Sequence, residues 1–174
     1  LACAEMGGRV SPTRIRESWR RVGRSDCCAC GGGHESFEEA LVCDADAFGG
    51  SSVLLSEPEL DFFNPNMVRS SRGLMAATKI GVGDKQEVFS WLDEEGLCLV
   101  GTSARAKKSY WDCEFKDGTA FVLGSEKLGL GPFWRERVQK WVRIPMEGRA
   151  SSLNLNVSAA CLMAEFNRTV SSTL

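Results

Sequence analysis

The sequence predicts an α/β domain in which a mainly parallel sheet is flanked by helices. Apolar segments with the length of buried strands lie at 52–55, 97–101, 120–124 and 141–145. Segments with helical periodicity lie before, between and after them, and strands that alternate with helices are typical of layered α/β folds. The chain has 174 residues, of which 43% are hydrophobic, so it is large enough to bury one core.

The first expected helix begins in the sequence SFEE. Ser36 is its expected N-cap and Glu39 the capping-box partner of that serine. Gly49 and Gly50 should end the helix, since glycine is common directly after a helix C-terminus. The buried strand at 52–55 follows.

The second expected helix has a capping box of its own, formed by Asp84 and Glu87, and ends at Gly96. Its apolar residues stand at helical spacing and are Val88, Trp91 and Leu92. After the three later strands comes a last helix with one apolar face, made of Leu155, Ala159, Leu162, Met163 and Phe166.

The first 35 residues differ in character from the rest of the chain. Their apolar periodicity is poor, and the glycine triplet at 31–33 interrupts any helix. We therefore expect an irregular N-terminal segment over residues 1–35 and one domain over residues 36–174.

The cysteine-rich run of that segment has part of the pattern of a zinc site. Cys27, Cys30 and His34 have suitable ligand types, and the first two have the C-x2-C spacing. Cys28 or Cys43 would be needed as a fourth ligand. No second pair of cysteines or histidines follows, so we expect an unstructured stretch and no bound metal.

The composition excludes several classes of protein. Lys and Arg number 21 against 23 Asp and Glu, and this net charge of −2 disfavours a strongly basic, non-specific nucleic-acid binder. The single histidine excludes mechanisms that need two. No apolar run reaches the roughly 18–20 residues of a membrane span, and no secretory signal is expected. The eight cysteines of a chain with a conventional core predict a reducing compartment, the cytoplasm or, in a eukaryote, an organelle.

Three segments in the C-terminal third carry the pattern of a ligand site: 124–131, 143–148 and 151–160. Each lies near the carboxyl end of an expected strand, where open α/β sheets bind ligands. The first is not a Walker loop, because Gly129 is followed by Leu130 instead of a lysine. It also lacks the second closely spaced glycine of a dinucleotide fingerprint.

Taken together, the three segments resemble motifs two and three of the SpoU (TrmH-like) RNA ribose 2′-O-methyltransferases of the SPOUT superfamily. In that family one strand ends in Gly-Asn/Ser-Glu-x-x-Gly, a later strand ends in Ile-Pro-Met, and Ser-Leu-Asn opens the last helix. The corresponding sequences here are GSEKLG at 124–129, IPM at 144–146 and SLN at 152–154. The resemblance is collinear and covers about residues 44–168.

This resemblance implies a SPOUT-type knotted domain, with a deep trefoil knot near the C-terminus, and S-adenosylmethionine as the methyl donor. Transferred by position, the donor site comprises Thr102, Gly124, Gly129, Ile144, Met146 and Leu153. The same transfer makes Glu126 and Asn154 polar groups that organise the catalytic pocket, with Ser152 orienting the loop.

The resemblance also implies RNA as the partner, ribosomal or transfer RNA, with neither a membrane nor DNA. Arg69, Arg72 and Arg149 are candidates to position its phosphates. Relatives usually dimerise through the knot region, so we expect a homodimer whose interface includes the last helix around Leu162, Met163 and Phe166.

One motif of the family is missing. Its motif one, Asn-x-Gly-x-x-x-Arg, carries the arginine associated with the 2′-hydroxyl proton. Aligned on the Ala-Phe-Gly at 47–49, the arginine falls on Cys43, the asparagine on Phe37 and the glycine on Glu39. Either the first 40 or so residues are not the family's N-terminal sequence, which we favour, or another basic group such as Arg69 or Arg72 substitutes.

Two functions follow from this combination of motifs. Motifs two and three favour an active RNA ribose 2′-O-methyltransferase. The altered motif one favours a catalytically impaired knot-fold protein that binds RNA or the donor without turnover.

Overall fold

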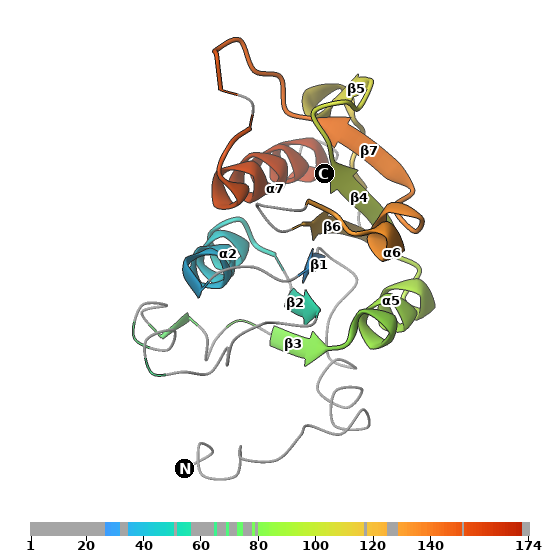
Figure 1. Ribbon diagram of the computed structural model, residues 1–174. Helices are drawn as coiled ribbons and strands as arrows, with labels where there is room; N and C mark the ends of the chain where they lie inside the picture. Colours follow the sequence, from blue (N-terminus) through green and yellow to red (C-terminus); the bar gives the residue numbers. More distant parts are fainter. Residues whose placement is uncertain are drawn as a thin grey trace.

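The computed structural model describes residues 27–31, 35–50, 52–56, 65, 69, 73–74, 78, 80–116, 118–124, 129–150 and 152–171. They form a seven-stranded sheet with helices against both faces (Figure 1). The strands are β1 (Cys27–Gly31), β2 (Ser52–Ser56), β3 (Ile80–Gly83), β4 (Cys98–Thr102), β5 (Lys108–Ser109), β6 (Thr119–Leu123) and β7 (Lys140–Arg143). The predicted α/β architecture is confirmed.

The strands follow the order β3-β2-β1-β6-β4-β7-β5 across the sheet, and its six neighbouring pairs are all parallel. In the half that carries the site, Val100 of β4 lies opposite Phe121 of β6 and Lys140 of β7. The prediction of a mainly parallel sheet is therefore confirmed. The knot stays a prediction.

β1 shows that the prediction of an irregular segment over residues 1–35 is wrong at 27–31. This strand lies inside the sheet, with Cys28 opposite Val53 of β2 and Phe121 of β6. A strand paired on both sides forms two backbone ladders, and this pairing outweighs the weak local preference of CCACG. Residues 1–26 and 32–34, including His34, lie outside the described residues.

The structure describes only part of the candidate zinc site. Cys27 and Cys30 belong to β1, and His34 lies outside the described residues, so the structure does not test the zinc hypothesis. Among the described residues, no group of three His, Cys, Asp or Glu residues is placed to hold a metal ion.

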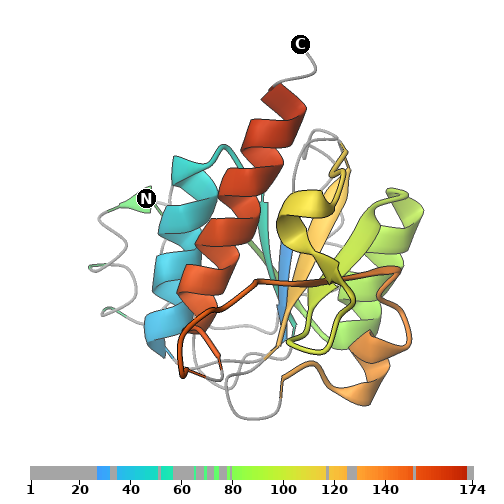
Figure 2. The same ribbon diagram turned by 90° about the horizontal axis from the view of Figure 1, so that it is seen from above.

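The helices divide between the two faces of the sheet (Figure 2). α2 (Glu35–Ala47) and α7 (Leu155–Ser171) lie side by side on one face, and α5 (Lys85–Glu94) and α6 (Pro132–Arg135) cover the other. A short 3-10 helix, η1 (Tyr110–Asp112), contacts α7. No helix in the described part of the chain has the length and apolar character that a membrane span requires.

The capping predictions have different outcomes. The box at α5 is confirmed: the backbone N–H groups of Gln86 and Glu87 donate to Asp84 at 2.8 Å, and Glu87 accepts from the Asp84 N–H at 3.1 Å. α2, by contrast, begins at Glu35, so Ser36 lies within the helix and is not its N-cap.

Two apolar clusters fill the spaces between the sheet and its helices. Neighbouring residues of one strand face opposite clusters, as the period of two requires: Val53 and Leu55 belong to the α2–α7 side and Leu54 to the α5–α6 side. β2 and β6 are consequently buried on both faces.

The apolar face of α7 packs within its own chain. Leu162, Met163 and Phe166 are 0%, 5% and 4% exposed and lie in the cluster that includes Leu41 and Val42 of α2. The prediction that these three residues form a dimer interface is therefore wrong, because the side chains that were to meet a second copy already fill the core.

Candidate functional site

Three loops meet at one edge of the sheet because the strands that precede them are parallel neighbours. β4 ends at Thr102, Gly124 follows β6 directly, and Ile144 follows β7 directly. Parallel pairing places the carboxyl ends of β6, β4 and β7 on the same edge, which is where open α/β sheets hold ligands. The segment 152–154, just before α7, approaches the same edge.

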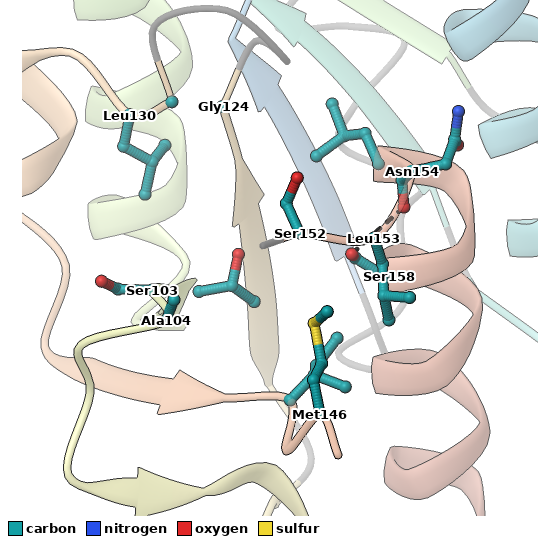
Figure 3. Close-up of a pocket in the computed structure, with 13 residues that line it drawn as sticks. Ser103, Ala104, Gly124, Leu130, Met146, Ser152, Leu153, Asn154 and Ser158 are labelled. Atoms are coloured by element: carbon teal, nitrogen blue, oxygen red, sulfur yellow. Dashed lines mark hydrogen bonds between the residues drawn. The ribbon is translucent and has the colours of Figure 1, made fainter. Parts of the chain in front are cut away.

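Between these loops lies a pocket of about 490 Å³, within the usual size range of small-molecule sites. Figure 3 shows Leu130 and Ser103 on one side of it and Ser152, Leu153 and Ser158 on the other. The lining residues are Thr102, Ser103, Ala104, Gly124, Gly129, Leu130, Ile144, Met146, Ser152, Leu153, Asn154, Leu155 and Ser158.

The structure brings most of the predicted site residues together here. The ones that line the pocket are Thr102, Gly124, Gly129, Ile144, Met146, Ser152, Leu153 and Asn154. Glu126 and Arg72 lie outside the described residues. Arg69 and Arg149 are exposed and are not part of the lining, so an RNA contact by either stays a prediction.

Sequence reasoning missed five lining residues. Ser103 and Ala104 continue the loop that Thr102 opens, so their nearness to the site was implicit in the sequence. Leu155 and Ser158 lie in the first turn of α7, and only the docking of that helix against the sheet edge brings them to the pocket. Leu130 arrives by the return of the loop that follows β6.

The part of the pocket lining that the structure describes is electrically neutral. None of its described lining residues carries an ionisable side chain; the walls are backbone, aliphatic groups, hydroxyls, one thioether and one amide. Such a surface can hydrogen-bond the edges of a flat heterocycle through main-chain groups and enclose its faces with Ile144, Met146 and Leu153. It can hold and orient a ligand, but these residues offer no group to take up a proton.

Asn154 caps the helix that closes the pocket. Its Oδ1 accepts from the Asn156 N–H at 2.9 Å, and its carbonyl accepts from the N–H and the hydroxyl of Ser158 at 3.0 and 3.2 Å. The amide is turned away from the side occupied by Ser103 and Leu130 (Figure 3). Asn154 thus fixes the path by which Leu153 enters the site, while its participation in catalysis stays a prediction.

Gly124 leaves room for the backbone of Gly129 and Leu130 to pass close to the end of β6. A Cβ at this position would overlap the backbone of Gly129 and Leu130, which pass directly over it. Gly129 has a φ of +63°, a left-handed conformation that favours glycine. The space at Gly124 is therefore taken by the chain's own backbone, and this close approach shapes one wall of the pocket.

Leu130 anchors the returning loop. It is 6% exposed and lies in the α5–α6 cluster with Trp134 and Val138. A Cβ on Gly101 of β4 would meet Leu130 at 3.0 Å and Val138 at 3.1 Å. The absence of a side chain at Gly101 therefore lets Leu130 and Val138 pack against the backbone of β4.

The position of the motif-one arginine lies on α2. Cys43 is half-buried there, and burial raises the pKa of the next residue, Asp44. No residue of α2 lines the pocket among those described. The absence of a motif-one arginine at this position stays a prediction from the sequence.

Comparison with known proteins gives a family match over most of the chain. The model described as the SpoU rRNA Methylase family matches residues 40–164. This range contains all the pocket residues and begins within α2.

Individual relatives and solved structures agree with that match. A 23S rRNA (uridine(2479)-2'-O)-methyltransferase of Streptomyces viridochromogenes is 31% identical over 72% of this chain and 46% of its own length. The crystal structure of an RNA 2'-O ribose methyltransferase matches with a TM-score of 0.77 at 32% identity, over 86% of this chain and 58% of that one.

A structure of AviRb from Streptomyces viridochromogenes in complex with AdoMet matches with a TM-score of 0.79 at 26% identity, over 86% of this chain and 63% of that one. The chain spans about half the length of the curated relatives it matches.

The close approach at Gly124 yields a stability prediction. Gly124→Ala should lower the free energy of unfolding by about 1–3 kcal/mol, because the added methyl group displaces the backbone of Gly129 and Leu130. Urea denaturation measures the effect. Gly148→Ala is the control, since a Cβ at Gly148 meets nothing within 4 Å. Equal losses of stability in the two variants would contradict the proposed crowding.

Proposed function

The chain belongs to the SpoU rRNA methylase family, and from this premise we propose that it methylates a ribose 2′-hydroxyl of RNA with S-adenosylmethionine as donor. The observation that carries the proposal is the convergence of the loops after β4, β6 and β7 with the start of α7 around one pocket. The AdoMet complex of AviRb, whose fold matches this chain, supports the choice of donor.

The chemistry of the lining fits the donor. An adenosyl group presents hydrogen-bonding edges and a flat apolar face, which suit main-chain groups flanked by Ile144, Met146 and Leu153. The donor supplies a methyl group that its sulfonium already activates. The protein then has to align the 2′-oxygen with that methyl group, and a rigid pocket performs this task by positioning.

The 2′-hydroxyl proton requires a group outside the described lining. The described pocket residues have no ionisable side chain, and the motif-one alignment places Cys43 at the position of the family arginine. This observation supports the second candidate, a protein that binds the donor or RNA with impaired turnover. The two candidates share the fold and the donor pocket and differ only in the rate of methyl transfer.

We also propose that two copies of the chain associate through the start of α7. Leu153 and Val157 are 37% and 48% exposed, a high value for aliphatic side chains, and they lie beside the pocket residue Ser158. A second copy placed there would cover the α7 side of the pocket.

Donor binding is tested by filling the pocket. Ser152→Trp should weaken the affinity for S-adenosylmethionine by at least about tenfold, or about 1.4 kcal/mol, because the indole ring occupies the space of the ligand. Isothermal titration calorimetry measures the affinity. Gln86→Trp, on the exposed surface of α5, should bind the donor like the parent chain. An unchanged affinity in Ser152→Trp would place the donor site elsewhere.

The activity prediction concerns the motif-one position. Cys43→Arg should raise methyl transfer by roughly 100- to 1000-fold, the effect of one group that stabilises a developing oxyanion, about 2.7–4 kcal/mol. Transfer of tritiated methyl groups to unmodified total RNA measures the rate. Ala47→Arg, which adds the same charge one turn further along α2, should give no gain. Robust transfer by the parent chain with no gain in Cys43→Arg would show that another residue performs this task.

The association prediction is tested at Val157. Val157→Asp should shift a dimer toward monomer in sedimentation velocity at micromolar concentration, because a carboxylate would be buried in the interface. Asn167→Asp adds the same charge at another exposed position of α7 and should leave the dimer intact. A monomeric parent chain would refute this mode of association.

A further inference from the structure

A second hollow, of about 720 Å³, adjoins the pocket. The two share the loop 102–104 and residues Gly129 and Leu130, so the same segments form a wall of each. The residues that only the second hollow uses are Arg105, Ala106, Lys107, Arg135 and Trp141. We call it the cationic hollow.

Three of these residues are cations from two separate elements. Arg105 and Lys107 belong to the loop after β4, and Arg135 ends α6. All three are exposed, and no ion pair or hydrogen bond of their side chains is found within the described part of the chain. No described carboxylate lines the hollow.

Arg137, also near α6, has side-chain contacts within the chain and serves as a comparison. Its Nη1 donates to the Phe133 carbonyl at 2.9 Å, and its guanidinium lies 3.7 Å from the centre of the Phe133 ring. The guanidinium of Arg137 is therefore held by contacts within the protein. No such contact is found for Arg105, Lys107 and Arg135 among the described residues. Three positive charges thus line one hollow in a chain with a net charge of −2.

The walls of the hollow suit a nucleotide. Trp141 is half-buried, and its ring would meet a Cβ on Gly101 at 3.1 Å, so it packs against Gly101 of β4 and gives the hollow an apolar wall. Aromatic and aliphatic walls accept the base or sugar of a single strand, while arginine and lysine pair with its phosphates.

From this arrangement we propose that Arg105, Lys107 and Arg135 bind a phosphate of the RNA strand beside the nucleotide whose ribose enters the pocket. The neighbouring nucleotide then lies against Trp141. The assignment of the strand as RNA rests on the proposed function. The shared loop 102–104 means that a strand held in the hollow is also held next to the donor pocket.

The test compares two charge-matched triple variants of the full chain. In the first, Arg105, Lys107 and Arg135 are all changed to Gln. In the second, the exposed residues Lys108, Lys116 and Lys140 are changed to Gln. These three lysines line another hollow together with Glu114 and Val142, and this hollow shares only Trp141 with the cationic hollow. Each variant loses three positive charges, so a difference in RNA affinity between them reflects where the charges lie and not how many are lost.

Binding of a short, fluorescent single-stranded RNA of mixed sequence is followed by anisotropy over a series of salt concentrations. The first variant should lose about 100-fold in affinity at 0.1 M salt, and the slope of log affinity against log salt should fall by about 0.7, the value for one neutralised phosphate of a single strand. The second should differ from the parent chain by less than about threefold.

Calorimetric titration with S-adenosylmethionine separates this inference from the proposed function. Unchanged donor affinity in the first variant, together with the loss of RNA affinity, supports the cationic hollow as an RNA site. Equal RNA affinities in the two variants, or an absence of salt-dependent RNA binding by the parent chain, would overturn it. Loss of donor affinity in the first variant would also overturn it, since the cations would then hold the donor's carboxylate. Failure of the parent chain to bind the donor would refute the proposed function itself.

Discussion

The parallel pairing of β6, β4 and β7 is the constraint on which the rest of the site depends. Because the three strands run in one direction, the backbone at Thr102, Gly124 and Ile144 leaves the sheet at the same edge. Each strand is held by its neighbours and by burial, so the loops begin from fixed points. A pocket formed in this way is as rigid at its base as the sheet, which is what a reaction that depends on alignment requires.

The returning loop divides the chemistry of this edge into two parts. Gly124 lets Gly129 and Leu130 pass directly over the end of β6, and Leu130 is held in the core below. On one side of these residues the described lining is neutral, and on the other side it carries three cations. A neutral surface suits an adenosyl group, and a cationic surface suits a phosphate. Gly129 and Leu130 therefore lie between a surface suited to the donor and a surface suited to RNA.

The strand ends and motif segments could be predicted because their signals are local. Thr102 and Ile144 each follow an apolar run, and the capping box at Asp84 fixes the start of α5 by contacts within four residues. β1 could not be predicted in this way, since its sequence has little strand preference and its stability comes from β2 and β6. The face of α7 was recognised as apolar, but the sequence could not tell whether its own sheet or a second copy covers it.

What the sequence by itself determined is the alternation of strands and helices and the residue types at the pocket, because periodicity, glycines and caps act over a few neighbouring positions. Only the tertiary structure decided which residues share a wall. Gly124 meets Gly129 and Leu130 through the fold of a loop, and Arg135 joins Arg105 because α6 packs beside the loop after β4. Both arrangements depend on how loops and helices pack in three dimensions, and periodicity, glycines and caps do not encode that packing.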